Sequence, residues 1–157
     1  MHNKQNIQDV CLVHYDRNYL LKSSHWLSDE ETNRLLNAGP QPTDEEREKW
    51  FLSLPSRSDY IIWGIQYKGE PAGACGLKHI DNGRAEWWMY IGEKSLRGKG
   101  LGGCVLRRLL EKVKTLDVKE LYMSVQKINT SCIKLHDNYG FVVTREDENR
   151  FYMSKFL

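Results

Sequence analysis

The strongest constraint on the fold of this chain is a cluster of four glycines within residues 97–103. The cluster follows an apolar and aromatic stretch and precedes a segment in which apolar residues recur at helical spacing, namely Leu106, Leu109, Leu110, Val113 and Leu116. At such a strand-to-helix junction, backbone amides and the positive end of the helix dipole converge on an anion, and glycines leave the amides accessible. The pattern predicts a loop that holds a phosphate or pyrophosphate, with Arg97 and Lys99 adding positive charge.

The same glycines also fit a dinucleotide fingerprint, through the spacing of Gly98, Gly100 and Gly103. A dinucleotide fold, however, opens with its fingerprint and continues through several parallel strand–helix units. Here most of the chain precedes the loop, which makes a dinucleotide-binding module the weaker alternative. A P-loop is excluded because Lys99 is followed by glycine, which leaves no Ser or Thr to ligate magnesium.

Length and charge narrow the class of protein. A chain of 157 residues can bury a continuous core, so we expect one domain over residues 1–157. The formal net charge of +2 falls far short of the basic excess typical of nucleic-acid binding. No apolar run reaches about 18 residues and the N-terminus is polar, so we expect a cytoplasmic protein with no membrane and no nucleic-acid partner. The cysteines include no Cys-x-x-Cys pair, and no metal site is expected.

The segment before the glycine cluster combines helices with an antiparallel meander. A short apolar strand begins at Val10, and capping boxes that begin at Ser28 and Thr43 predict two helices separated by a Gly-Pro loop. Turns at residues 68–70 and 81–83 then divide an apolar region into three strands.

The segment after the amphipathic helix predicts one more strand–helix unit and a final pair of strands. Alternating apolar residues indicate a strand over residues 119–125, and Asn129 then serves as the N-cap of a helix that Gly140 ends in a left-handed conformation. The closing strands are expected over residues 141–143 and 150–157.

Two motifs give the chain a family resemblance. Residues 97–102 match fully the Arg/Gln-x-x-Gly-x-Gly/Ala hallmark of the GNAT superfamily of N-acetyltransferases, and residues 129–141 resemble that family's segment from Asn to Gly-Phe. The order of elements is similar along nearly the whole chain. The resemblance implies an α/β (α+β) fold in which about four helices flank a central, splayed, mixed but mostly antiparallel sheet of about six to seven strands.

The same resemblance implies acetyl-CoA as the co-substrate, with no metal. The glycine loop would bind the pyrophosphate, the preceding strand would pair with the pantetheine arm as an added strand would, and Asn129 would contact the cofactor. The cofactor-binding residues expected on this basis are Met89, Tyr90, Ile91, Arg97, Gly98, Lys99, Gly100, Leu101, Gly102 and Asn129.

The implied reaction is direct transfer of the acetyl group to an amine, with an acid that protonates the departing thiolate. The family's acid is usually a tyrosine four residues before the Gly of Gly-Phe, and His136 occupies that position here. An imidazole can transfer a proton near neutral pH. Tyr139, about one helical turn further on, is the competing acid. Glu86 is the candidate base, acting directly or through water, with His79 as an alternative.

The acceptor site is expected in the N-terminal part, where aromatic residues are frequent. The candidates are His25, Trp26, Trp50 and Trp87, with Trp88 lining the same cleft. Local segments here resemble GNAT branches that acetylate amino sugars on nucleotides or protein N-termini. Acidic residues cluster only at helix caps, which favours a small-molecule amine, such as an amino-sugar nucleotide, over a basic peptide. Protein N-terminal acetylation and a non-catalytic CoA-binding sensor are the alternatives, and a monomer or homodimer is expected.

Overall fold

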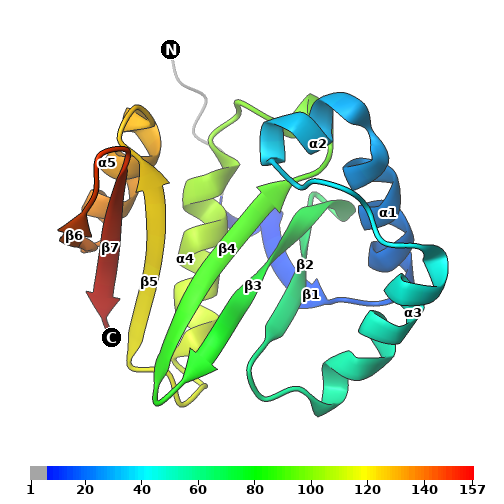
Figure 1. Ribbon diagram of the computed structural model, residues 1–157, viewed down its shortest axis with the longest axis horizontal. Coiled ribbons are helices and arrows are strands. Elements are labelled where there is room, and N and C mark those ends of the chain that lie inside the picture. Colours follow the sequence, from blue (N-terminus) through cyan, green and yellow to red (C-terminus); the bar gives the residue numbers. More distant parts are fainter. Residues whose placement is uncertain (1–6) are drawn as a thin grey trace.

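A seven-stranded sheet organises the computed structural model, in which residues 7–157 are described (Figure 1). The strands lie in the order β1-β2-β3-β4-β5-β7-β6. Their bounds are β1 (Val10–His14), β2 (Ile61–Tyr67), β3 (Glu70–Asp81), β4 (Arg84–Ile91), β5 (Glu120–Gln126), β6 (Val142–Glu146) and β7 (Arg150–Phe156). The predicted strands are therefore confirmed, with small shifts at their ends.

The sheet is mixed and splayed. Every neighbouring pair of strands is antiparallel except β4 and β5, which are parallel. Their pairing is confined to Arg84–Glu86 of β4 and Glu120–Tyr122 of β5, and toward their C-terminal ends the two strands diverge (Figure 1). The mixed, mostly antiparallel, splayed sheet that the sequence led us to expect is thus confirmed.

Two tight turns set the register of the meander. Lys68 and Gly69 both have positive φ, 49° and 84°, and Asn82 and Gly83 have 50° and 77°. Two consecutive residues with positive φ match the twist of the flanking antiparallel strands, so these turns close the hairpins without splaying them.

Five helices are found in the described part of the chain, one more than expected. They are α1 (Arg17–Ser28), α2 (Glu30–Leu36), α3 (Asp44–Ser53), α4 (Leu101–Val113) and α5 (Thr130–Asn138). The expectation of two helices between the first strands was wrong, because α1, α2 and α3 all lie there. Ser28 does not begin a capping box: it ends α1, and Asp29 caps α2 by accepting a hydrogen bond from the Thr32 amide at 3.0 Å.

The other predicted helix boundaries hold. Thr43 and Glu46 form the expected reciprocal capping box of α3. The Asn129 side chain accepts from the Cys132 amide and caps α5, and Gly140 follows that helix with φ of +88°. None of the helices within residues 7–157 combines the length and the apolar composition needed to cross a membrane.

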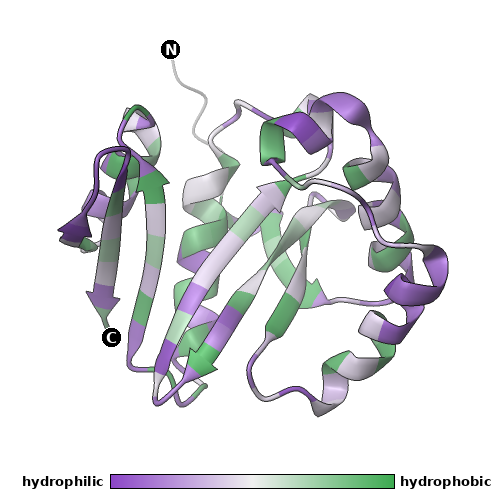
Figure 2. Ribbon diagram, viewed as in Figure 1, coloured by the Kyte–Doolittle hydropathy of each residue, from purple (hydrophilic) through white to green (hydrophobic). Residues whose placement is uncertain are grey.

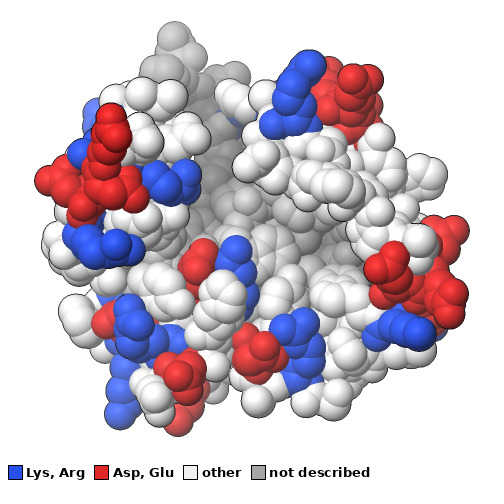
Figure 3. Space-filling view, viewed as in Figure 1, with Lys and Arg blue, Asp and Glu red and all other residues white. Residues whose placement is uncertain are grey.

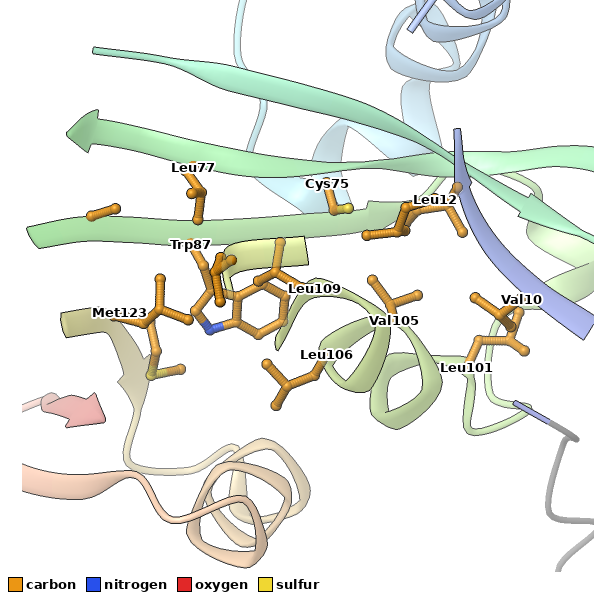
Figure 4. Close-up of a cluster of buried hydrophobic side chains, with 14 of the residues drawn as sticks. Val10, Leu12, Cys75, Leu77, Trp87, Leu101, Val105, Leu106, Leu109 and Met123 are labelled. Atoms are coloured by element: carbon orange, nitrogen blue, oxygen red, sulfur yellow. The ribbon is translucent and has the colours of Figure 1, made fainter. Parts of the chain in front are cut away.

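The main core lies between the sheet and α4. The buried face of α4 consists of Leu101, Val105, Leu106, Leu109 and Val113, as its sequence periodicity predicts. These side chains meet Leu12, Cys75, Leu77 and Trp87 from the strands (Figure 4). In Figure 2 apolar and polar residues alternate along this helix.

The opposite face of the sheet carries a second, aromatic cluster. Its buried members are Tyr15, Tyr19, Leu20 and Ala74, and Trp50, Phe51, Trp88 and Tyr90 pack against them. Successive side chains of a strand point to opposite faces, so Trp87 faces α4 whereas Trp88 and Tyr90 face α1 and α3. Strand β4 thereby contributes to both layers.

Candidate active site

The glycine loop enters α4 through two residues in the left-handed region. Gly98 and Gly100 have φ of +73° and +77°, and Gly100 is the N-cap of α4. A Cβ at either position would meet no described atom within 4 Å, so the space above the loop is open. Gly103, in contrast, lies close to Leu135 of α5. The loop therefore presents an accessible backbone at a helix N-terminus, a geometry that binds anions.

Arg97 holds the start of this loop in place. Its Nε donates to the Ile91 carbonyl at 3.0 Å, and its Nη2 donates to the Gly92 carbonyl and to the Thr32 hydroxyl at 3.0 Å. The guanidinium thus ties the end of β4 and helix α2 to the loop. Lys99, which is exposed, is the cation that remains accessible in the loop itself.

A cavity of about 680 Å³ lies between the sheet and helices α1 to α3. Strand β4 contributes Trp88, Met89 and Tyr90 to its wall, and Trp50 of α3 lies opposite. Its other lining residues are Tyr15, Leu20, Ser23, Leu27, Leu36, Ala38, Gln41, Pro42, Glu46, Arg47, Tyr60, Ile62 and Lys78. This volume suits a small organic ligand.

The phenols of the cavity wall are neutral. Burial raises the pKa of Tyr15, Tyr60 and Tyr90 above the ordinary value of 10. Tyr15 and Tyr90 both donate to the Ser23 hydroxyl, at 2.8 and 3.0 Å. The wall is therefore an apolar aromatic surface with hydroxyl groups held in fixed positions.

Of the residues predicted to line the acceptor cleft, Trp50 and Trp88 lie at this cavity. Trp87 is buried at 6% exposure on the opposite face of β4, because adjacent strand residues alternate sides. Trp26 is also buried: its indole covers Gly92 and donates to the Glu93 carboxylate at 3.0 Å. His25 is exposed at a shallower depression beside Gly92. The sequence predicts that Trp87 and Trp88 share one cleft, and only Trp88 lines it.

His136 is only 2% exposed, and both of its ring nitrogens are hydrogen-bonded. Nδ1 donates to the Cys132 carbonyl at 2.8 Å, and Nε2 accepts from the Trp87 indole at 3.1 Å. Burial lowers the pKa of His136, which the hydrogen bond to Cys132 only partly offsets. In this arrangement the ring is neutral and Nε2 carries no proton to give.

The other candidate catalytic groups lie on either side of the sheet. Tyr139 is half-buried, and its hydroxyl lies 3.3 Å from the Gly103 carbonyl in the first turn of α4. Glu86 lies at the last paired position of β4 and β5, on the same face as Trp88. Its carboxylate lies 3.2 Å from Nδ1 of His79 and 3.5 Å from Nζ of Lys78.

Comparison with known proteins assigns the family. Residues 22–141 match the model of the acetyltransferase (GNAT) family. The chain belongs to that family. Its enzymes are acetyl-CoA-dependent acetyltransferases, and this chain is accordingly an N-acetyltransferase. A search of curated protein sequences found no match.

Solved structures support the fold. Spermidine N-acetyltransferase from Vibrio cholerae, in complex with CoA and spermine, superposes with a TM-score of 0.81 at 17% identity, covering 95% of this chain and 96% of that one. Campylobacter jejuni N-acetyltransferase PseH with acetyl coenzyme A gives 0.71 at 16% identity, covering 94% and 98%. The ribosomal alpha-N-protein acetyltransferase RimL gives 0.73 at 15% identity, covering 95% and 91%.

The residues present fit the family's co-substrate. The open backbone at Gly98 and Gly100 is a cradle that a side chain would fill, and beyond Glu86 the sheet edge of β4 diverges from β5. Within residues 7–157, no group of three or more His, Cys, Asp or Glu side chains is placed to hold a metal ion. Asn129 is exposed, and its side-chain oxygen is engaged in capping α5.

Proposed function

We propose that this acetyltransferase acts on the primary amine of a small molecule that occupies the cavity beside β4. The observation that carries the proposal is the shared wall: Trp88, Met89 and Tyr90 line the cavity and also lead along β4 toward the glycine loop. A cavity of about 680 Å³ suits a small molecule better than an extended peptide. An amino-sugar nucleotide falls within this class of small-molecule amines.

In this proposal acetyl-CoA supplies the activated acetyl thioester. The backbone amides of Leu101 and Gly102 at the start of α4, together with Lys99, would hold its pyrophosphate. Arg97 would fix the conformation of the loop through its hydrogen bonds to the end of β4. The backbone of Met89, Tyr90 and Ile91 would pair with the pantetheine arm. Asn129 would contact the cofactor through its amide nitrogen, since its oxygen caps α5.

We assign the proton-transfer roles by geometry. Tyr139 would supply a proton to the thiolate, because its hydroxyl lies beside the first turn of α4. Glu86 would take a proton from the amine, directly or through water, from the cavity face of β4. His136 would serve instead to position Trp87 and the start of α5, because both of its nitrogens are engaged.

Release of free CoA thiol from acetyl-CoA tests the proposal, with a panel of simple amines, amino-sugar nucleotides and peptides with free N-termini. We expect turnover with small amines and little or none with the peptides. Preferred turnover of peptides would replace the proposal by protein N-terminal acetylation. Stabilisation by acetyl-CoA without release of CoA from any amine would indicate a non-catalytic CoA sensor, and stabilisation by NAD alone would indicate a dinucleotide module.

A further inference from the structure

The cavity beside β4 is walled by a row of aromatic rings. Tyr60 and Trp88 lie nearly parallel, with 27° between their planes and centroids 6.1 Å apart, and Trp88 and Tyr90 follow with 17° and 6.2 Å. Trp50 stands edge-on to Tyr60 at 76°. These rings make the wall aromatic and apolar, a surface that favours contact with a planar ring over contact with a flexible charged chain.

One polar atom in this wall is unsatisfied. The Trp88 indole N–H is buried and has no hydrogen-bond partner among the described residues. The ring is fixed over Gly76 of β3, where a Cβ would come within 3.0 Å of it. Buried indole N–H groups nearly always find an acceptor. Because this nitrogen lies against β3 and is not accessible from the cavity, a ligand would contact the ring of Trp88 rather than its N–H.

The charges that line the cavity are mostly positive. Arg47 donates to the Ser24 hydroxyl at 3.1 Å and lies 3.5 Å from the Gln41 amide oxygen, both neutral groups. The ammonium group of Lys78 forms an ion pair with the Glu86 carboxylate at 3.5 Å. The cavity's carboxylate, Glu46, is engaged in the capping box of α3. In Figure 3 the surface between the α1–α3 side and the β5–β7 side is hollowed, and most charged side chains gather around its margin.

We propose that the acceptor is a primary amine that carries a planar aromatic ring and an oxyanion, a carboxylate or a phosphate, and that it is not a polyamine. The inference rests on the proposed function and specifies its substrate. The ring would lie along Trp88 and its parallel neighbours, and the oxyanion would face Arg47. A polyamine would need several carboxylates, whereas the cavity offers one that is already engaged.

A matched set of amines tests the inference through CoA release. Aminomethylbenzoate and aminomethylphenyl phosphate carry the ring with either oxyanion. Aminomethylcyclohexanecarboxylate replaces the planar ring, methylbenzylamine lacks the anion, and spermidine represents polyamines. We expect kcat/KM to be at least about tenfold higher for one of the two aromatic acids than for each of the other three, the size of effect expected when an aromatic contact or a hydrogen bond to a charged group is lost.

Two variants with matched controls test the residues. Trp88→Leu removes the aromatic ring from the cavity wall, and Trp63→Leu makes the same change in the α4-side core. Arg47→Met removes the cavity cation, and Lys49→Met removes an exposed cation from the same helix. We expect Trp88→Leu to lower kcat/KM for the aromatic acid about tenfold, and Arg47→Met to abolish the difference between that acid and methylbenzylamine, with both controls near wild type.

The outcomes separate the inference from the proposed function. Equal or better turnover of spermidine, the saturated acid or methylbenzylamine overturns the inference and leaves acetyl transfer to small amines standing. An aromatic acid that raises the melting temperature with CoA present but is not acetylated, when no other amine is either, supports the pocket assignment and refutes the transfer. Aromatic acids that neither bind nor react also overturn the inference, as does unchanged selectivity in the Trp88 and Arg47 variants.

Discussion

The two ring nitrogens of His136 connect α5 to β4 through Cys132 and Trp87. We expect His136→Phe to lower the free energy of unfolding by about 1–3 kcal/mol near pH 7, because it leaves the buried Trp87 N–H without an acceptor. Urea unfolding of wild type and variant measures this change. A large fall in kcat with unchanged stability would instead return His136 to the role of general acid.

The protonation of His136 gives a second test of its position. Because burial lowers its pKa below 6.5, the unfolded chain binds the proton at a higher pH than the folded chain does. The free energy of unfolding should therefore decrease as the pH falls from about 6.5 toward the folded pKa, and be unaffected by this group above that window. The decrease should be smaller in His136→Gln and unchanged in His25→Gln, whose side chain is exposed. Equal pH dependence in both variants would contradict a buried neutral His136.

Tyr139 is the group that we assign to proton donation. Tyr139→Phe should lower kcat about a hundredfold or more, the usual contribution of a general acid, with little change in the KM for acetyl-CoA. Stability should change little, because its hydroxyl bond to Gly103 is long at 3.3 Å. Steady-state kinetics with Tyr152→Phe as control checks this, since Tyr152 bonds Asp147 on the exposed β6–β7 turn. Wild-type kcat in Tyr139→Phe would exclude the assignment.

The sequence predicted the role of a residue where a short motif determined it. It did not predict the role where this depended on which face of the sheet the side chain occupies. The glycine loop and Asn129 follow from short-range spacing. Trp87 and Trp88 are adjacent in an apolar strand buried on both faces, so the sequence does not say which one faces the cavity. The partner of His136 lies 49 residues away, and only the tertiary fold brings it there.

Among the helices, α4 is predictable from the sequence whereas α1 is not. An apolar stripe marks α4 unambiguously. Helix α1 places Ser23 among its buried residues beside Tyr19, Leu20 and Trp26, which weakens its apolar pattern. It is held by contacts with the sheet, such as the Tyr19 hydroxyl bond to the Ile65 carbonyl at 3.0 Å, rather than by its own periodicity. Such a helix cannot be predicted from its own sequence pattern, because its stability depends on tertiary contacts.

The glycine loop permits a prediction about an element with a matched control. Gly100→Ala and Gly69→Ala each place a side chain at positive φ in open space, which costs about 1–2 kcal/mol of stability in both cases. Only Gly100→Ala should also raise the KM for acetyl-CoA, because its methyl group enters the space above the anion-binding backbone. Equal KM values in the two variants, measured by CoA release, would show that this loop does not hold the pyrophosphate.

Across the whole molecule, the acceptor side and the cofactor loop are joined at one corner. Lys94, just before the loop, pairs with Asp29 and Glu31 at 3.0 Å each, and Trp26 bonds Glu93. Arg97 adds its bond to Thr32, which is buried in α2. Because α2 ends at Leu36, and Leu36 and Ala38 line the cavity, we expect a shift of the loop to be transmitted to the proposed acceptor site.

The contacts at this corner lead us to expect that Arg97 affects the KM values of both substrates. Arg97→Lys keeps the charge but cannot bond the Ile91 and Gly92 carbonyls and Thr32 together, so the KM values for acetyl-CoA and for the amine should each rise about three- to tenfold. Arg34→Lys, on the exposed face of α2, should change neither value. Two-substrate kinetics distinguishes the cases: a rise confined to acetyl-CoA would mean that Arg97 orders only the loop, whereas a rise in both requires that α2 move with it.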